Sequence, residues 1–182
     1  DAMRRPWVTF LLALLVGATA LWAQAPGLKL GDPCPAFSLP GTDGRDHNQE
    51  AKEPLLMVVF LSTECPYVMA TQARINAYAQ HYAGQVAVLA INANDVGTHA
   101  KESLADMKAQ VAGQRFVFPY LKDTPQAVTR AFGAVCTPDF FLFDASRKLA
   151  YRGRMDDSWR DAAKVTVRDL EAATEALLAG RP

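Results

Sequence analysis

The chain has 182 residues and half of them are hydrophobic, which is enough for one domain with its own core. Its 19 basic and 19 acidic residues give no net charge, so the composition excludes the strong basic bias typical of proteins that bind nucleic acids. We therefore expect a single domain without a nucleic-acid partner.

The N-terminal segment differs from the rest of the chain. Arg4 and Arg5 precede an almost unbroken apolar stretch over residues 7–21, and Ala23 provides a small residue at its exit. This combination is typical of a secretory signal peptide. The sequence therefore predicts a signal peptide over residues 1–23, one domain over residues 24–182 and a secreted or periplasmic location. The alternative is an uncleaved anchor that makes a membrane a partner, because the stretch is close to the shortest that spans a bilayer.

After this segment, apolar runs of strand type alternate with segments of helical spacing. The first half predicts, in chain order, a hairpin over residues 36–48, a buried strand at 55–61, a helix from 66 to 84, a buried strand at 86–91 and a helix at 98–112. The second half predicts an extended segment at 116–121, a helix capped by Asp123 and opened by Pro125, a strand at 140–143 with an antiparallel partner at 149–154, and a helix at 166–178. This order predicts an α/β fold in which a central mixed sheet carries helices on both faces.

Cys65 stands at the junction where the strand at residues 55–61 ends and the next helix begins. A helix N-terminus offers unpaired backbone N–H groups and the positive end of the helix dipole, and both stabilise a thiolate. The thiolate is the nucleophilic form of cysteine. Pro66 suits the first turn of the helix, because its missing N–H has no partner there. The junction therefore predicts a reactive thiol; the alternative is a small buried hydrophobic residue.

Cys34 and Cys136 are the other two cysteines, and an odd number leaves at least one thiol without an intrachain partner. Cys136 precedes Thr137-Pro138, and a proline at this place suits the entry to a strand. Cys34 lies in the opening loop, where we interpret it as an incidental or partner-bonding thiol; a catalytic role is the weaker alternative. The histidines show no metal-ligand spacing, so we expect no metal and no cofactor. A copper site that uses Cys65 is the weaker alternative.

These features together resemble the thioredoxin superfamily, and most closely its AhpC/TSA redoxin-like (peroxiredoxin-like) family. The matching segments lie at residues 31–33, 37–39, 43–44, 65–68, 90–95, 118–121, 136–144, 151–154 and 156–157. The resemblance implies a thioredoxin-like fold with an N-terminal hairpin extension, and it puts Cys65 at the position of the nucleophile. It also implies that Pro138 is a cis-proline whose loop faces Cys65, which makes Cys136 a possible resolving cysteine.

The chain departs from the family pattern at several positions. Ser62 stands where close relatives often have the first cysteine of a CxxC motif, and Val68 stands where thioredoxins have the second. Val58 replaces the proline of the peroxiredoxin motif. The peroxiredoxin active-site arginine is also missing, unless one of three arginines reaches the site from elsewhere: Arg130, Arg152 or Arg154.

Three functions are open. In a thiol–disulfide oxidoreductase, Cys65 attacks a protein or small-molecule disulfide, Cys136 resolves the mixed disulfide, and an external thiol reductant restores the enzyme. In a thiol peroxidase, peroxide oxidises Cys65 to a sulfenic acid with Ser62 as a hydrogen-bond partner. The third function is a non-catalytic redoxin-fold binding module. The residues expected to support either enzyme's active site are Ser62, Thr63, Glu64, Pro66, Thr137 and Pro138.

Overall fold

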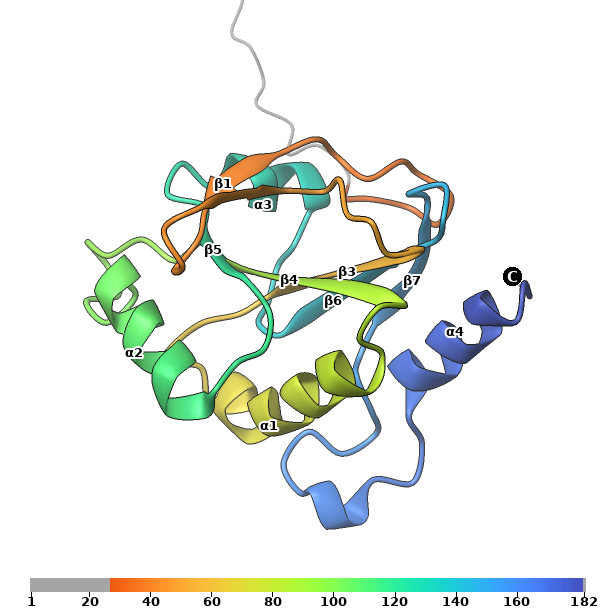
Figure 1. Cartoon of the computed structure of the whole chain (residues 1–182). Helices are drawn as coiled ribbons and strands as arrows, with labels where there is room; N and C mark the ends of the chain where they lie inside the picture. The colour runs from red at the N-terminus through yellow and green to blue at the C-terminus, as the bar shows by residue number, and fades with distance from the viewer. Residues whose placement is uncertain (1–26, 182) are drawn as a thin grey trace, which may run out of the picture.

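A computed structural model describes residues 27–181 as a central β-sheet between two layers (Figure 1). The predicted signal peptide, residues 1–23, lies outside the described residues. The elements are β1 (Ser38–Pro40), β2 (Asp46–Asn48), β3 (Leu55–Phe60), α1 (Pro66–His81), β4 (Val86–Asn92), α2 (Leu104–Gln114), β5 (Tyr120–Lys122), α3 (Ala127–Phe132), β6 (Asp139–Phe143), β7 (Leu149–Gly153), a short 3-10 helix (Ala162–Lys164) and α4 (Asp169–Leu178). No helix within residues 27–181 has the length and apolar character needed to cross a membrane.

The main sheet has the strand order β5-β4-β3-β6-β7. Strands β3, β4 and β5 are parallel, whereas β6 is antiparallel to β3, and β7 is antiparallel to β6. Every residue of β3 is buried, as an unbroken apolar run predicts for a strand with both faces covered. The predicted mixed sheet is therefore confirmed, and so is the N-terminal hairpin, in which β1 pairs antiparallel with β2.

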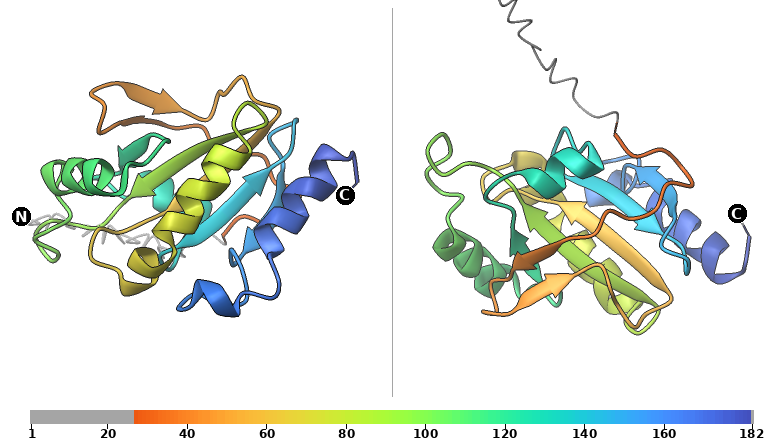
Figure 2. Two further views of the ribbon diagram at one scale, coloured as in Figure 1. Left: turned by 60° about the horizontal axis from the view of Figure 1, so that its bottom comes forward. Right: turned by 90° about the horizontal axis from the view of Figure 1, so that it is seen from above.

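Helices α1, α2 and α4 cover one face of the sheet, and Figure 2 (left) shows α1 and α4 lying across it. Alternate side chains of β3, among them Met57 and Val59, belong to the core on this face. The fully buried helix side chains that join them are Val68 and Ile75 from α1, Met107 from α2 and Leu170 from α4. This packing fixes α1 along the sheet, so its N-terminus stays close to the end of β3.

Helix α3 and the N-terminal hairpin cover the opposite face, as Figure 2 (right) shows. Phe132 of α3 is fully buried there, and its ring packs edge-on against Phe60, Phe141 and Phe143 with centroid separations of 5.4, 5.3 and 5.9 Å. Phe37, just before β1, adds an edge-on contact with Phe132 at 6.1 Å. Helices therefore lie on both faces as predicted, and the hairpin shares the cover of the second face with α3.

The helix predicted over residues 98–112 begins at Leu104 instead. The hydroxyl of Ser103 accepts a hydrogen bond from the N–H of Asp106 at 3.2 Å, and the Asp106 carboxylate accepts one from the N–H of Ser103 at 3.1 Å. This reciprocal capping box fixes the start of α2. The residues before it form turns, and Glu102 is buried inside the protein.

Other boundaries also differ from the prediction. Helix α3 begins at Ala127 rather than at Pro125, because the Asp123 carboxylate accepts hydrogen bonds from the N–H groups of Ala127 and Thr129 at 3.1 and 2.8 Å. Strand β5 is shorter than the predicted segment, and α4 begins at Asp169. The order and type of the elements are as predicted.

The pairing of β3 with β6 brings two loops to one edge of the sheet. In this antiparallel pair Phe60 lies opposite Asp139, so the loop that leaves β3 meets the loop that enters β6. Cys65 lies in the first loop and Cys136 in the second. Two cysteines that are distant in the sequence are thus brought to neighbouring loops.

Candidate active site

Cys65 is the N-cap residue of α1, and Pro66 is the first residue of that helix. The half-buried thiol donates a hydrogen bond to the backbone carbonyl of Thr137, with 3.2 Å between sulfur and oxygen. The carbonyl of Cys65 accepts the N–H of Met69 at 2.9 Å, which continues the helix. The thiol predicted to be reactive therefore faces the loop that contains Pro138.

The peptide bond between Thr137 and Pro138 is cis, as the resemblance implied. Cys136 precedes this pair and is exposed, with its Sγ 3.8 Å from the carbonyl oxygen of Pro138. Partial burial raises the pKa of Cys136, and the Asp139 carboxylate and the nearby Cys65 add to this increase. Cys136 is therefore a thiol rather than a thiolate at neutral pH, and it adjoins the residue that contacts Cys65.

Cys34 lies at the opposite end of the sheet from Cys65. Its N–H donates to the carbonyl of Arg147 at 2.8 Å, and the Arg147 guanidinium donates to the carbonyl of Pro54, just before β3. Burial raises the pKa of Cys34 to about 12, although the Arg147 charge opposes the increase. Because Cys65 follows the far end of β3, Cys34 is not part of the site.

A buried carboxylate, that of Glu102, supports the loop before Cys65. Glu102 is 1% exposed and accepts hydrogen bonds from the Ser62 hydroxyl and from the N–H groups of Thr63 and Glu64, the last two at 3.0 and 3.3 Å. Burial alone would raise its pKa, but the hydrogen bonds prevail and lower the pKa of Glu102 to about 2. The side chain is therefore an ionised acceptor that fixes the backbone just before Cys65.

Two asparagines and a lysine complete the surroundings of Glu102. Asn92, at the end of β4, and Asn94 donate to its carboxylate at 2.5 and 3.2 Å. Lys122 of β5 donates to the Asn92 side chain at 2.9 Å and to the carbonyls of Asn94 and Glu102 at 2.6 and 2.7 Å. Burial lowers the pKa of Lys122, and the negative charge of Glu102 opposes the decrease. This network joins β4 and β5 to the loop that precedes Cys65.

Glu102 and Lys122 were not predicted from the sequence. Glu102 contacts Thr63 across 39 positions of the chain, and Lys122 contacts Asn92 across 30, so no local periodicity connects them. One signal was present, because the Ser103-x-x-Asp106 pattern of a capping box predicts a helix start directly after Glu102.

The predicted supporting residues Thr63 and Glu64 contact the loop before α2 with their side chains. The Thr63 hydroxyl donates to the carbonyl of Lys101. The Glu64 carboxylate lies 3.5 Å from the Lys101 ammonium in an exposed ion pair. Exposed pairs of this kind contribute little to stability, so the backbone N–H of Glu64 matters more to the site than its charge.

Each arginine that could replace the missing peroxiredoxin arginine has another partner. These partners are the carbonyl of Pro125 for Arg130 at 2.7 Å, the carboxylate of Asp139 for Arg152 at 3.0 Å and the carboxylate of Asp169 for Arg154 at 2.6 Å. Within residues 27–181, none of the three donates a hydrogen bond to Cys65. The Ser62 hydroxyl is likewise engaged by Glu102, so a peroxide at Cys65 would compete for its single donor.

Two grooves flank Cys136. The first, which we name the aromatic groove, has a volume of about 270 Å³. Its lining includes Tyr67, Cys136, Pro138, Phe140, Met155 and Trp159. The second, the polar groove, has a volume of about 360 Å³, and its lining includes Asn94, Gln126, Thr129 and Cys136. Cys136 is therefore accessible from both sides of its loop.

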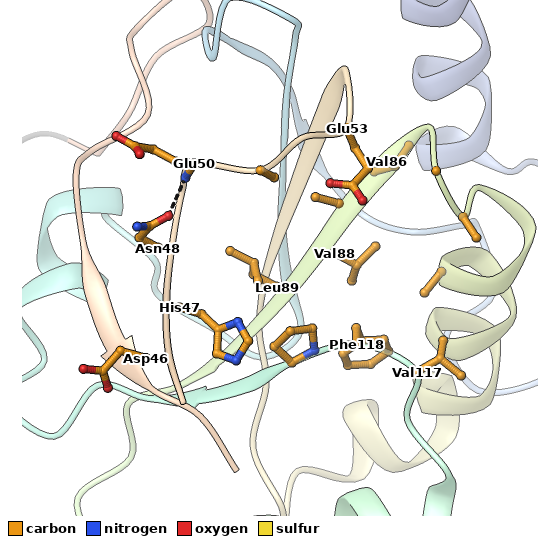
Figure 3. A pocket seen from close by; sticks show the side chains of 16 residues that line it. Asp46, His47, Asn48, Glu50, Glu53, Val86, Val88, Leu89, Val117 and Phe118 are labelled. Atoms are coloured by element: carbon orange, nitrogen blue, oxygen red, sulfur yellow. Dashed lines mark hydrogen bonds between the residues drawn. The ribbon is translucent and has the colours of Figure 1, made fainter. Parts of the chain in front are cut away.

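A further pocket of about 460 Å³ contains none of the cysteines. Figure 3 shows Asp46, His47 and Asn48 of β2 on one side of it and Val86 and Val88 of β4 on the other. Among residues 27–181, no group of three or more His, Cys, Asp or Glu side chains is arranged to hold a metal ion.

Comparison with known families agrees with this geometry. Residues 29–173 match the model of the Redoxin family. The chain belongs to the Redoxin family. It is thus an oxidoreductase with a thioredoxin-like fold and thiol-based redox chemistry, as the sequence predicted.

Several solved structures are similar to this Redoxin protein. A hypothetical protein from Sinorhizobium meliloti 1021 is 40% identical over 86% of this chain and 87% of its own, with a TM-score of 0.81. An uncharacterized conserved protein from Geobacillus kaustophilus is 36% identical over 85% of this chain and 84% of its own, with a TM-score of 0.79. Peroxidoxin BcpB from Mycobacterium tuberculosis shares the fold, with 18% identity, coverage of 85% and 99% and a TM-score of 0.64. A comparison with curated protein sequences gave no significant match.

Proposed function

We propose that this Redoxin protein is a thiol–disulfide oxidoreductase in which Cys65 is the nucleophile and Cys136 the resolving cysteine. One observation carries the proposal: the Cys65 thiol lies 3.2 Å from the carbonyl of Thr137, the residue that follows Cys136. A resolving thiol must reach the nucleophile without large rearrangement of the backbone. The two cysteines lie in adjacent loops at one sheet edge, which supports this role.

The reaction proceeds by two exchanges. The Cys65 thiolate attacks one sulfur of a substrate disulfide, forms a mixed disulfide and releases the first substrate thiolate. Cys136 then loses its proton to solvent and attacks the Cys65 sulfur, which releases the second substrate thiol and leaves a disulfide between Cys65 and Cys136. An external dithiol reduces this disulfide and is itself oxidised.

Three features favour disulfide exchange over peroxide reduction. Glu102 engages the Ser62 hydroxyl, the nearby arginines bind other partners, and Val58 replaces the peroxiredoxin proline. The usual partners of a bound peroxide are thus occupied or missing. Cys136 is instead exposed and accessible, as a second thiol in exchange must be.

Cysteine variants test the proposal in an assay that follows reduction of a protein disulfide. We expect Cys65→Ser to abolish turnover and Cys136→Ser to accumulate mixed disulfides on Cys65, because the second exchange is blocked. Cys34→Ser is the matched control and should keep the activity of the wild type. Full activity of Cys65→Ser would refute the proposal, and rapid formation of a sulfenic acid with peroxide would favour the peroxidase instead.

We also propose that the protein is exported. Residues 1–23 have the basic, apolar and small-residue order of a signal peptide, which supports this location. Disulfides form and persist outside the cytosol, so a thiol–disulfide exchange enzyme has its substrates there. Cell fractionation with mass measurement of the purified chain checks both location and cleavage. Protein of full mass in the cytosol would contradict export.

A further inference from the structure

The first half of β4 has a free lateral side in the main sheet. Strand β5 pairs with β4 only over residues 90–92, so within residues 27–181 no strand lies beside Val86–Leu89 on that side. The N–H of Ala90 faces this side and donates to the carbonyl of Pro119 at 3.0 Å. Because backbone groups alternate sides along a strand, the N–H and the carbonyl of Val88 face the same way, where no strand accepts or donates a hydrogen bond.

Contacts with α1 keep the chain that precedes β5 away from this side of β4. The Asn76 side chain of α1 accepts a hydrogen bond from the N–H of Val117 at 2.9 Å and donates one to the carbonyl of Arg115 at 3.2 Å. The rings of Phe116 and Phe118 stack on each other with their centroids 4.8 Å apart. The chain therefore joins the sheet only at β5, and the free side of β4 is built into the fold.

The pocket of about 460 Å³ in Figure 3 lies along this free side, and we name it the lateral pocket. Its lining includes every residue of Val86–Leu89, and residues 46–48 of β2 lie across from them. Successive side chains of a strand point to opposite faces, so a cavity that contacts four in a row lies beside the strand. Four residues of a strand extend over about 13 Å. The lateral pocket thus occupies the place of one further short strand.

The rim of the lateral pocket is acidic. Asp46, Glu50 and Glu53 belong to its lining, which includes no lysine or arginine among residues 27–181. None of these three carboxylates forms an ion pair with a described residue. The other titratable residue of the lining, His47, contacts the Asp43 carboxylate at 3.0 Å. The rim therefore carries negative charge that the described part of the chain does not neutralise.

We propose that the lateral pocket binds an extended, basic segment of a partner protein, which joins the main sheet as a strand beside β4. Addition of a strand to a free sheet edge is a recurring mode of peptide recognition, in which main-chain hydrogen bonds provide affinity. Here Val88 supplies the main-chain groups. The pocket adjoins the start of β4, whereas Cys65 follows the end of the parallel strand β3, so this inference does not depend on the proposed function.

The two walls of the lateral pocket specify an alternating sequence for the bound segment. The carboxylates come from β2 and the residues after it, on the face of the sheet that the hairpin covers. On the face that α1 covers, the lining is apolar and includes Ala79, Val88 and Phe118. Side chains of an added strand would point alternately to these two faces. Lysine or arginine alternating with an apolar residue therefore matches both walls.

The charge of the rim favours a basic partner over a second copy of this chain. Two copies joined through this side of β4 would bring their acidic rims together, and like charges across an interface oppose association. A small cation could meet the carboxylates, but it lacks the main-chain groups that pair with Val88. An extended basic polypeptide satisfies the charge and the hydrogen bonds together.

Peptide probes test the proposal with the full chain. The probe is a fluorescent heptapeptide that alternates Lys and Val, and its control has Glu in place of each Lys. We expect fluorescence anisotropy to detect binding of the Lys peptide and to show that the double variant Glu50→Gln with Glu53→Gln binds it about fivefold more weakly, because two exposed ion pairs are lost. Glu171→Gln, which changes a carboxylate outside the pocket, should bind like the wild type. No binding of the Lys peptide, or equal binding of the Glu peptide, would overturn the proposal.

Backbone methylation tests whether the probe pairs as a strand. The Lys peptide is N-methylated either at every Lys or at every Val, so that each form lacks the donors of one side. We expect one form to lose binding and the other to keep it, because only one side of an added strand faces β4. Equal binding of both forms would refute strand addition.

Hydrogen exchange measured by NMR locates the bound peptide. At a peptide concentration about ten times Kd, exchange of the Val88 amide should slow about tenfold. The Leu89 amide, which faces β3, is the internal control and should not change. Binding without slower exchange at Val88 would place the peptide elsewhere and overturn the proposal. A dimer of the free protein that the Lys peptide dissociates in sedimentation equilibrium would also overturn it, since a second copy would then occupy the pocket.

Discussion

Glu102 shows how one buried side chain can hold a reactive loop in place. An ionised carboxylate inside a protein is costly unless donors surround it. Here the donors are backbone N–H groups of the loop itself, together with the side chains of Ser62, Asn92 and Asn94. The charge of Glu102 therefore depends on the loop conformation, and the loop conformation depends on the charge.

We expect the free energy of unfolding to decrease in acid because of Glu102. Its folded-state pKa of about 2 lies below the ordinary value of 4.5, so between these values the folded protein binds fewer protons than the unfolded chain. The stabilisation is complete above about pH 4.5 and is lost as the pH falls towards 2. Chemical denaturation between about pH 6 and about pH 3 measures this loss. The Glu102→Gln variant should lose less free energy of unfolding over that range than the wild type. An equal loss in both proteins would contradict the assignment.

Residues of the site differ in how far the sequence could predict them. Cys65 and Pro138 stand at strand boundaries, and a local pattern identifies such positions. The placement of Cys136 beside Cys65 required the family resemblance, because only the register of β3 and β6 brings their loops together. Glu102 was not predicted, because its partners in the loop before Cys65 are 38 to 40 positions away and the capping box that follows it indicates a helix start, not a buried carboxylate.

At the scale of elements, α1 connects the reactive site to the groove. Cys65 caps its N-terminus, Tyr67 is its second residue, and Arg74, further along the helix, holds the loop after β7. The position of Cys65 and one wall of the aromatic groove therefore depend on the same helix. A shift of α1 along the sheet would disturb both at once.

Arg74→Met is expected to destabilise the protein by about 3 kcal/mol, because it leaves a buried carboxylate without its partner. Asp156 is the group left unpaired, since its side chain is 3% exposed in the ion pair. Urea denaturation measures the loss. The double variant Arg74→Met with Asp156→Asn should recover part of the stability. A single variant as stable as the wild type would show that the ion pair between Arg74 and Asp156 contributes nothing to stability.

Element prediction succeeded where the apolar pattern was continuous. Strand β3 is an unbroken apolar run, and β6 is one after its first residue, Asp139; both lie where the sequence predicted them. The predicted start of this helix at residue 98 was wrong. Ser103 and Asp106 form a capping box, which begins α2 at Leu104 instead. Side-chain hydrogen bonds to the backbone thus decided a boundary that periodicity alone placed too early.

For the whole molecule, the sheet separates two thiol environments. Cys65 and Cys136 lie at the edge where β3 ends, and Cys34 lies near the edge where β3 begins. A disulfide requires Cα atoms within about 7 Å. Cys34 therefore cannot pair with Cys65 while the sheet is intact.

Alkylation at neutral pH should discriminate between these environments. The pKa of Cys34 rises from an ordinary 9.0 to about 12, so its thiolate fraction is about a thousandfold lower than that of an unperturbed thiol. We expect mass spectrometry to find Cys34 unmodified when the folded protein is treated with the alkylating reagent. The same treatment in urea should alkylate Cys34 fully. Equal rates of Cys34 alkylation in both states would contradict its burial.

The antiparallel pairing that sets Phe60 opposite Asp139 also links folding to redox energetics. A disulfide between Cys65 and Cys136 would close a loop of about 70 residues, which restricts the unfolded chain and stabilises the fold by about 4 kcal/mol. The linkage is reciprocal, so folding would lower the reduction potential of the pair by about 90 mV relative to the unfolded chain. Folding would thereby make the dithiol a stronger reductant and favour electron flow from the enzyme to its substrates.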